Sequence, residues 1–101
     1  MLIEFSVVPM GTGASVSAAV ARILKLVMES GMPYRANPMG TVVEGDWSRL
    51  MELVHRCHDE ALTDADRVIT TIKIDDFKGR DNRIEKKLES VEQKLGMKLN
   101  R

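Results

Sequence analysis

Three short stretches of the chain hold residue types that could do chemistry, and the first is a glycine turn. The stretch GTGASVS, from Gly11 to Ser17, follows a strand-like pattern and runs into a helical one. A Walker phosphate loop would need a Lys followed by Ser or Thr, and a dinucleotide fingerprint would need a third glycine where Val16 stands. The stretch therefore predicts a turn that leads into a helix. An anion resting on the free N–H groups of the helix start stays as the alternative.

The second stretch is HRCH, which places His55, Cys57 and His58 within one helical turn. His55 and His58 are spaced i, i+3 and could share a metal ion, but structural zinc sites use four protein ligands and catalytic sites usually three. The sequence has no second Cys or His cluster, so we predict no metal and no cofactor. Cys57 is the only cysteine, which excludes an intrachain disulfide. Packing of Cys57 or His58 in the core is the alternative role.

The third stretch is IDD, which ends at Asp76. Adjacent residues of a strand point to opposite faces, so Asp75 and Asp76 are poorly placed to act as a pair. Cys57 falls in mid-helix rather than at an electropositive helix start, and no Ser-x-Gly elbow accompanies the serines. We therefore predict no catalytic residue and a protein that is not an enzyme.

Composition and charge narrow the classes of partner. The 101 residues predict one domain, residues 1–101, and 44% of them are hydrophobic, enough for a core. Lys plus Arg and Asp plus Glu are both 15, and this balance argues against nucleic-acid binding. The uncharged stretch between Glu4 and Arg22 is interrupted by proline and glycine and is too short to span a membrane. A soluble, cytoplasmic protein is the expectation.

The first half of the chain has the periodicity of alternating strands and helices. Residues 2–8 alternate apolar and polar side chains, as in a strand with one buried face, and Pro9 is expected to end it. The next apolar side chains recur at helical spacing from Val16 to Met28, with Ser15 as a plausible N-cap. Residues 34–45 then predict two short strands joined near Asn37-Pro38.

The second half repeats the helix–strand pattern and adds a helix. Asp46 can cap a second helix, and DRVITTIKIDD, which starts at Asp66, predicts the last strand. Asn82 with Glu85 resembles a capping box for a third helix that closes at Gly96. The order predicts an α+β, ferredoxin-like βαββαβ antiparallel sheet with helices on one face, plus an extra C-terminal helix. The apolar seam of that helix suits packing against a neighbour: Ile84, Leu88, Val91 and Leu95.

The uncovered face of such a sheet would carry an unusual mixture of side chains. It would hold Glu4, Ser6, Thr71, Lys73 and Asp75 beside Leu2, Val8 and Ile69. Three interpretations remain open: a solvated face with Glu4–Lys73 cross-strand pairing, an interface with a second subunit, or a small-ligand site walled by the sheet and a partner chain.

Three separated motifs, EFSVVPMGTG, NPMGTVVEGD and TTIKIDD, resemble the thiamine-binding-protein-like family of small ferredoxin-like proteins. The resemblance spans roughly residues 2–99. It implies homo-oligomers that pair through their sheets, commonly as dimers of dimers, and binding of thiamine or its hydroxymethylpyrimidine part by some members. No enzymatic activity is firmly attached to the family.

The motif positions include groups that could bind an aminopyrimidine. Glu44 is the acid we would choose as acceptor for the exocyclic amine. The full candidate set comprises polar side chains for the ring and its substituents and two apolar walls: Ser6, Asn37, Thr41, Glu44 and Thr71, with Met39 and Trp47.

The sequence thus predicts a cytoplasmic homo-oligomer, dimer or tetramer, that binds thiamine or hydroxymethylpyrimidine and associates through its sheet face and C-terminal helix. Neither nucleic acid nor membrane is an expected partner. The alternatives are a structural or interaction module, or a stress-response factor with an inter-subunit cavity and no thiamine ligand.

Overall fold

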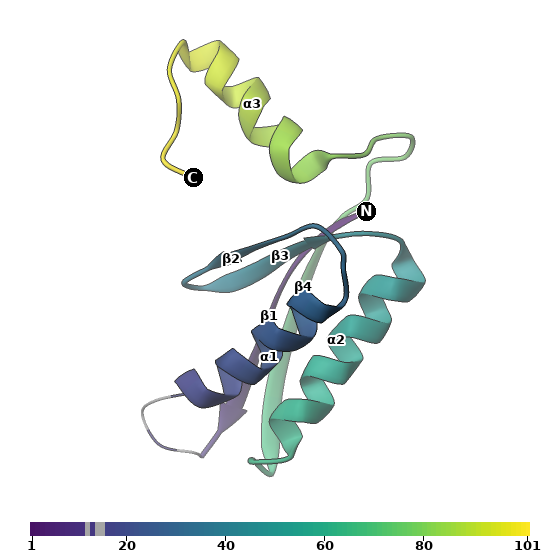
Figure 1. Cartoon of the computed structure of the whole chain (residues 1–101), viewed down its shortest axis with the longest axis vertical. Coiled ribbons are helices and arrows are strands. Elements are labelled where there is room, and N and C mark those ends of the chain that lie inside the picture. The colour runs from purple at the N-terminus through teal and green to yellow at the C-terminus, as the bar shows by residue number, and fades with distance from the viewer. Residues whose placement is uncertain (12, 14–15) are drawn as a thin grey trace.

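A computed structural model describes residues 1–11, 13 and 16–101 of the chain (Figure 1). Within these described residues, four strands and three helices follow one another in the expected order. They are β1 (Leu2–Met10), α1 (Ser17–Glu29), β2 (Tyr34–Asn37), β3 (Gly40–Glu44), α2 (Trp47–Leu62), β4 (Arg67–Asp75) and α3 (Arg83–Leu95). Among the described residues, no helix is both long and apolar enough to cross a membrane.

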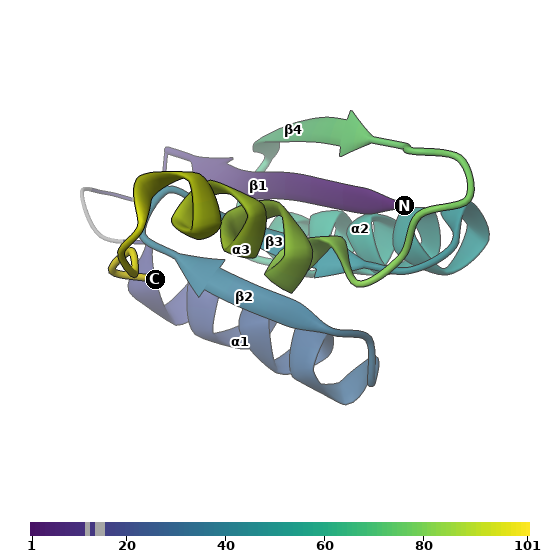
Figure 2. The ribbon, with the colours of Figure 1, turned by 90° about the horizontal axis from the view of Figure 1, so that it is seen from above.

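The strands form one antiparallel sheet in the order β2-β3-β1-β4. Helices α1 and α2 lie on the same side of this sheet, and α3 lies on the other side, next to β2 and β3 (Figures 1 and 2). The predicted ferredoxin-like α+β fold with an extra C-terminal helix is therefore confirmed.

The core fills the space between the sheet and the first two helices. Alternation in β1 puts Ile3, Phe5 and Val7 on the helix-covered side, and all three are buried. They pack with Val43 of β3 and with the inner stripes of the two helices. The buried helix residues in this cluster are Ile23, Val27, Leu50, Leu53, Val54, Cys57 and Ala61.

One predicted boundary is wrong, because β1 does not end at Pro9. It continues to Met10 and pairs with β4 in an unbroken register from Leu2↔Asp75 to Met10↔Arg67. Pairing with β3 stops at Phe5↔Thr41, and beyond that point no strand within the described part of the chain pairs with this side of β1, which we call its free edge. A proline on a free edge lacks an N–H that no neighbouring strand would use, which explains why the strand tolerates it.

The helix starts follow the sequence expectations only in part. The Asp46 carboxylate accepts the Arg49 N–H at 2.8 Å and caps α2, as predicted. The residue preceding α1 is Val16, whose side chain makes no cap, and Ser15 lies outside the described residues. The capping box at Asn82 is wrong: Asn82 has a left-handed backbone (φ 51°) and its side chain does not cap α3.

Candidate ligand site

A cavity of about 340 Å³ opens where β1 runs past the end of β3. We name it the β1-edge cavity. It is lined by four residues of β1, by the segment around the β2–β3 turn, by Val16 just before α1 and by three residues of α1. The lining comprises Phe5, Ser6, Val7, Val8, Val16, Val20, Ile23, Leu24, Ala36, Asn37, Pro38, Met39, Gly40 and Thr41.

The lining pattern places this cavity against the edge of β1 rather than against one face of the sheet. Consecutive strand residues point to opposite faces, yet Phe5, Ser6, Val7 and Val8 all touch the same cavity. Only the strand edge is shared by residues of both faces. The β1-edge cavity exists because β1 has nine residues and β3 has five, so the β2–β3 hairpin ends while β1 continues.

The β2–β3 hairpin forms the opposite wall through a two-residue turn, Pro38-Met39, closed by the pair Asn37↔Gly40. Gly40 allows this turn to pass close to β1, because a Cβ there would lie 3.3 Å from the Phe5 carbonyl oxygen. The hairpin thereby brings Asn37 and Thr41 to the β1-edge cavity.

The described residues that line the cavity are mostly apolar, and none of them is charged. Among the described lining residues, only Ser6, Asn37 and Thr41 have polar side chains, and none has an ionisable one. The residues between β1 and α1 that the structure does not describe are Thr12, Ala14 and Ser15, which carry no charge either. A site of this kind can bind a neutral ring by shape and a few hydrogen bonds.

The structure brings together four of the seven predicted site residues: Ser6, Asn37, Met39 and Thr41. Thr71 lies opposite Ser6 on the neighbouring strand β4 and does not line the cavity. Trp47 begins α2 and is 58% exposed, also outside the lining. Whether any of the seven contacts a ligand stays a prediction.

Sequence reasoning missed the α1 wall of the cavity. Of the predicted apolar stripe, Ile23 and Val27 are buried, whereas Val20 and Met28 are exposed and Val16 precedes α1. Val16, Val20, Ile23 and Leu24 line the β1-edge cavity instead of serving the core alone. The signal that could have found them is the difference in strand length. A nine-residue strand beside a five-residue one leaves backbone and helix surface without a strand to cover them.

Glu44 lies at the other end of β3 and holds the start of α3. Its carboxylate oxygens accept the backbone N–H groups of Arg83 at 2.9 Å and Ile84 at 3.4 Å. These N–H groups belong to the first turn, where the helix dipole favours a negative charge. Glu44 thus does from a distant strand what the Asn82 side chain was expected to do.

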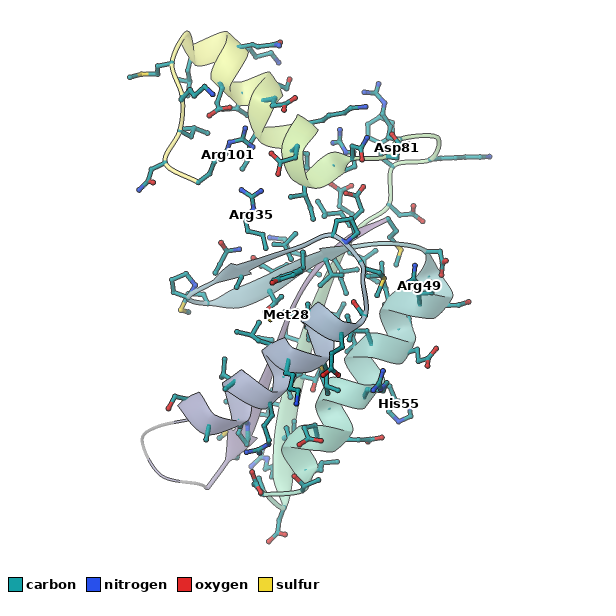
Figure 3. All side chains as sticks on the ribbon, viewed as in Figure 1. Met28, Arg35, Arg49, His55, Asp81 and Arg101 are labelled. Carbon is teal, nitrogen blue, oxygen red and sulfur yellow. The ribbon has the colours of Figure 1, made fainter. Side chains whose placement is uncertain are left out.

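Further ion pairs tie α3 to β2 and to the C-terminus. Arg35 of β2 pairs with Glu85, and Arg101 pairs with Glu85 at 3.1 Å and with Glu92 at 3.0 Å. Figure 3 shows Arg35 and Arg101 in the space between β2 and α3. A cavity of about 390 Å³ in this region is lined by charged side chains, including Glu44, Glu85 and Lys86, so it is a solvated gap beneath a surface helix.

Replacing Glu44 with Ala is expected to free the start of α3. The Arg83 and Ile84 amides should exchange hydrogen about 5- to 30-fold faster, since a charge-assisted cap contributes about 1–2 kcal/mol. Glu44→Gln keeps an acceptor oxygen and should lose less protection. Hydroxymethylpyrimidine affinity, measured by calorimetry on the same variants, should stay within about twofold of the original. A large loss of affinity would instead support the prediction that Glu44 contacts the ligand.

Comparison with known proteins identifies the family of the chain and supports its fold. The sequence profile of the family described as thiamine-binding protein matches residues 3–92. The chain belongs to the thiamine-binding protein family. The matched range includes the sheet except for Leu2, both α1 and α2, and every residue that lines the β1-edge cavity.

Relatives in this family have similar length. A UPF0045 protein of Methanocaldococcus jannaschii is 38% identical over 88 residues, which cover 87% of this chain and 88% of that protein. A UPF0045 protein of Mycobacterium tuberculosis is 35% identical over 96 residues, 94% of each chain.

Solved structures share the fold. The crystal structure of a hypothetical protein of Methanocaldococcus jannaschii has a TM-score of 0.84 and 37% identity, covering 89% of this chain and 93% of that one. A Thermotoga maritima protein, for which a role in thiamine biosynthesis or salvage has been suggested, has a TM-score of 0.78. At 24% identity, with coverage of 89% and 96%, it shows the common fold alone.

The HRCH stretch supplies no metal site to this family member among the described residues. His55 is exposed, faces away from the core (Figure 3) and pairs with Asp59 at 3.2 Å. His58 Nδ1 lies 2.6 Å from the Thr70 hydroxyl of β4, and Cys57 is fully buried. The interpretation of Cys57 as a core residue is confirmed.

Burial raises the pKa of the Cys57 thiol from its ordinary 9.0 to about 11. The folded protein should therefore resist maleimide at pH 8 and react once unfolded. Between pH 9 and 11 the folded state holds this proton more tightly than the unfolded state, so the free energy of unfolding should fall as pH rises. In urea titrations, the free energy of unfolding should fall less between pH 8 and pH 10.5 in Cys57→Ala than in the unaltered protein. Equal falls would contradict this.

Proposed function

We propose that the protein binds the aminopyrimidine part of thiamine, as hydroxymethylpyrimidine or within a larger ligand, in the β1-edge cavity. One observation carries the proposal: a ligand-sized cavity whose described lining residues include no ionisable group, placed between two of the motifs that resemble the family. The name of the family supports a thiamine-related ligand.

The cavity suits a small heteroaromatic ring. Its volume of about 340 Å³ is at the lower end of the range for small-molecule sites. Apolar walls come from β1 and α1, and the Ser6 and Thr41 hydroxyls and the Asn37 amide are available as donors and acceptors. An aminopyrimidine needs both kinds of group and an apolar wall.

The uncharged lining favours the neutral pyrimidine over the charged parts of thiamine. An ion moved away from water without a partner charge costs several kcal/mol. Neither the thiazolium cation nor a phosphate would find a counter-charge among the described lining residues. We therefore place the pyrimidine inside the cavity and any thiazolium or phosphate group at its mouth.

The proposal assigns no reaction to the site. General acid–base catalysis uses His, carboxylate, Lys, Tyr or Cys groups within reach of the substrate, and the described lining offers hydroxyls and one amide. A carrier or sensor of the pyrimidine is the role that fits such a lining.

Calorimetric titration of hydroxymethylpyrimidine, thiamine and thiamine diphosphate into the purified protein tests this function. We expect saturable binding of hydroxymethylpyrimidine with a Kd of about 1–100 μM, a range that corresponds to about −8 to −5.5 kcal/mol. Thiamine should bind no more than about tenfold tighter, and the diphosphate no tighter than thiamine. Absence of binding by all three compounds would refute the proposal.

We also propose self-association through the uncovered sheet face and α3. Val8 and Ile69 are paired across β1 and β4 on that face and are 42% and 44% exposed. None of the residues of α3, all of which the structure describes, is buried, although the helix carries an apolar seam. Native mass spectrometry should find dimers or tetramers; a monomer would leave the open face solvated. The single free Cys57 fits our proposed cytoplasmic location.

A further inference from the structure

The edge of β1 that faces the cavity carries backbone groups without a strand partner. β1 pairs with β3 only from Leu2↔Glu44 to Phe5↔Thr41. Continued by two positions, the same register would set Ser6 opposite Gly40, the first residue of β3, and Val7 opposite Met39, which belongs to the turn. Beyond Phe5, therefore, β1 has a strand neighbour on the β4 side alone among the described residues.

The direction of the Val7 backbone follows from the hydrogen bonds at the other end of the strand. Gly45 N–H donates to the Met1 carbonyl at 3.0 Å, so the polar backbone groups of Met1 face the β3 side. Backbone groups alternate sides along a strand, and the register with β4 is unbroken from Leu2 to Met10. Ile3, Phe5 and Val7 therefore face the β3 side as well, and for Val7 that side is the cavity.

Pro9 supports this assignment independently. It has the same parity as Val7, so its backbone nitrogen also faces the side that β3 has left. Had the alternation been the reverse, proline would have removed a hydrogen bond from the β1–β4 ladder. The sequence places its one strand proline where no ladder bond is lost.

We infer that the N–H and C=O of Val7 bind the ligand edge-on, as donor and acceptor for the ring nitrogen and the adjacent amine of the aminopyrimidine. Opposed residues in an antiparallel pair exchange both an N–H···O and an O···H–N bond. The amine and the neighbouring ring nitrogen present one donor and one acceptor side by side. The ring edge thus replaces the strand residue that β3 does not supply.

This inference rests on the proposed function and adds the group that selects the ligand. It identifies the ligand class as neutral heteroaromatic rings with an amine beside a ring nitrogen. Side-chain contacts from Ser6, Asn37 and Thr41 are then secondary to a backbone contact that substitutions other than proline leave in place.

The first test compares Val7→Pro with Val7→Ala. Proline removes the N–H on the unpaired side while preserving the β4 ladder, as Pro9 already does; alanine loses the side chain but keeps the N–H. By calorimetry, Val7→Pro should bind hydroxymethylpyrimidine at least about tenfold more weakly than Val7→Ala, or about 1.4 kcal/mol. Equal affinities of the two variants would overturn the inference.

A ligand analogue separates a lost hydrogen bond from a steric effect of the proline ring. The pyridine analogue, with CH in place of the ring nitrogen beside the amine, cannot accept the Val7 N–H. The unaltered protein and Val7→Ala should each bind this analogue at least about tenfold more weakly than hydroxymethylpyrimidine. Val7→Pro should bind the two compounds with equal affinity, because its N–H is already absent. Additive losses would contradict the contact.

If circular dichroism shows that Val7→Pro does not fold, amide chemical shifts of the unaltered protein test the inference instead. The Val7 amide proton should move downfield on saturation with hydroxymethylpyrimidine and far less with the pyridine analogue. A stationary Val7 amide in a saturated complex overturns this inference and leaves the proposed function standing. Failure of hydroxymethylpyrimidine to bind at all would remove the proposed function itself.

Discussion

Replacing Ala36 with Phe is expected to abolish measurable binding of hydroxymethylpyrimidine, a loss of about 100-fold or more. Ala36 lines the β1-edge cavity from β2 and lies opposite Thr41, on the helix-facing side of the hairpin. Its small side chain helps to leave the cavity open. A phenyl ring at this position would occupy space between the hairpin and α1 that the proposal gives to the pyrimidine.

Ala36→Ser is the matched control, because it changes the chemistry of the wall with little change in volume. It should bind within about threefold of the unaltered protein. Ala36 is exposed to solvent, so the free energies of unfolding of both variants should lie within about 1 kcal/mol of that of the unaltered protein. Undiminished binding by a folded Ala36→Phe protein would place the ligand elsewhere.

Replacing Leu50 with Ala is expected to lower the free energy of unfolding by about 2–5 kcal/mol. Leu50 of α2 is fully buried in the core between the helices and the sheet. Truncation leaves a cavity that its close-packed neighbours can fill only in part. A domain of about 100 residues is commonly stable by about 5–15 kcal/mol, so this loss is a large share of the total.

Leu62, at the end of the same helix and 41% exposed, provides the control for Leu50. Leu62→Ala should cost less than about 1 kcal/mol in urea unfolding followed by circular dichroism. Similar losses at the two positions would mean that α2 does not pack on the sheet in the way described.

Much of the fold could be predicted because local patterns and burial agree. The alternation of Ile3, Phe5 and Val7 defines the inner face of β1, and Asp46 supplies a cap within its own helix. The two errors arise where a distant element decides. Pro9 remains in a strand because β3 is short, and α3 is capped by Glu44, 39 residues from Arg83 in sequence.

The sequence could predict those members of the candidate site that lie along the β3 side of β1. Ser6, Asn37, Met39 and Thr41 meet because antiparallel register brings the hairpin turn beside β1. Thr71 belongs to the strand on the other side of β1, and its separation from the cavity requires the strand order. The free backbone of Val7 has no signature in side-chain identity at all, since it depends on the relative lengths of two strands.

Backbone amide shifts during titration with hydroxymethylpyrimidine test the central claim most directly. We expect saturable changes concentrated in two segments that are distant in sequence, residues 6–8 and residues 36–41, with a common Kd. Weaker changes should appear in the first half of α1, and the α3 amides should stay still. Saturable shifts confined to α3 or to the uncovered face of β4, or no saturable shift, would contradict a ligand site at the free edge of β1.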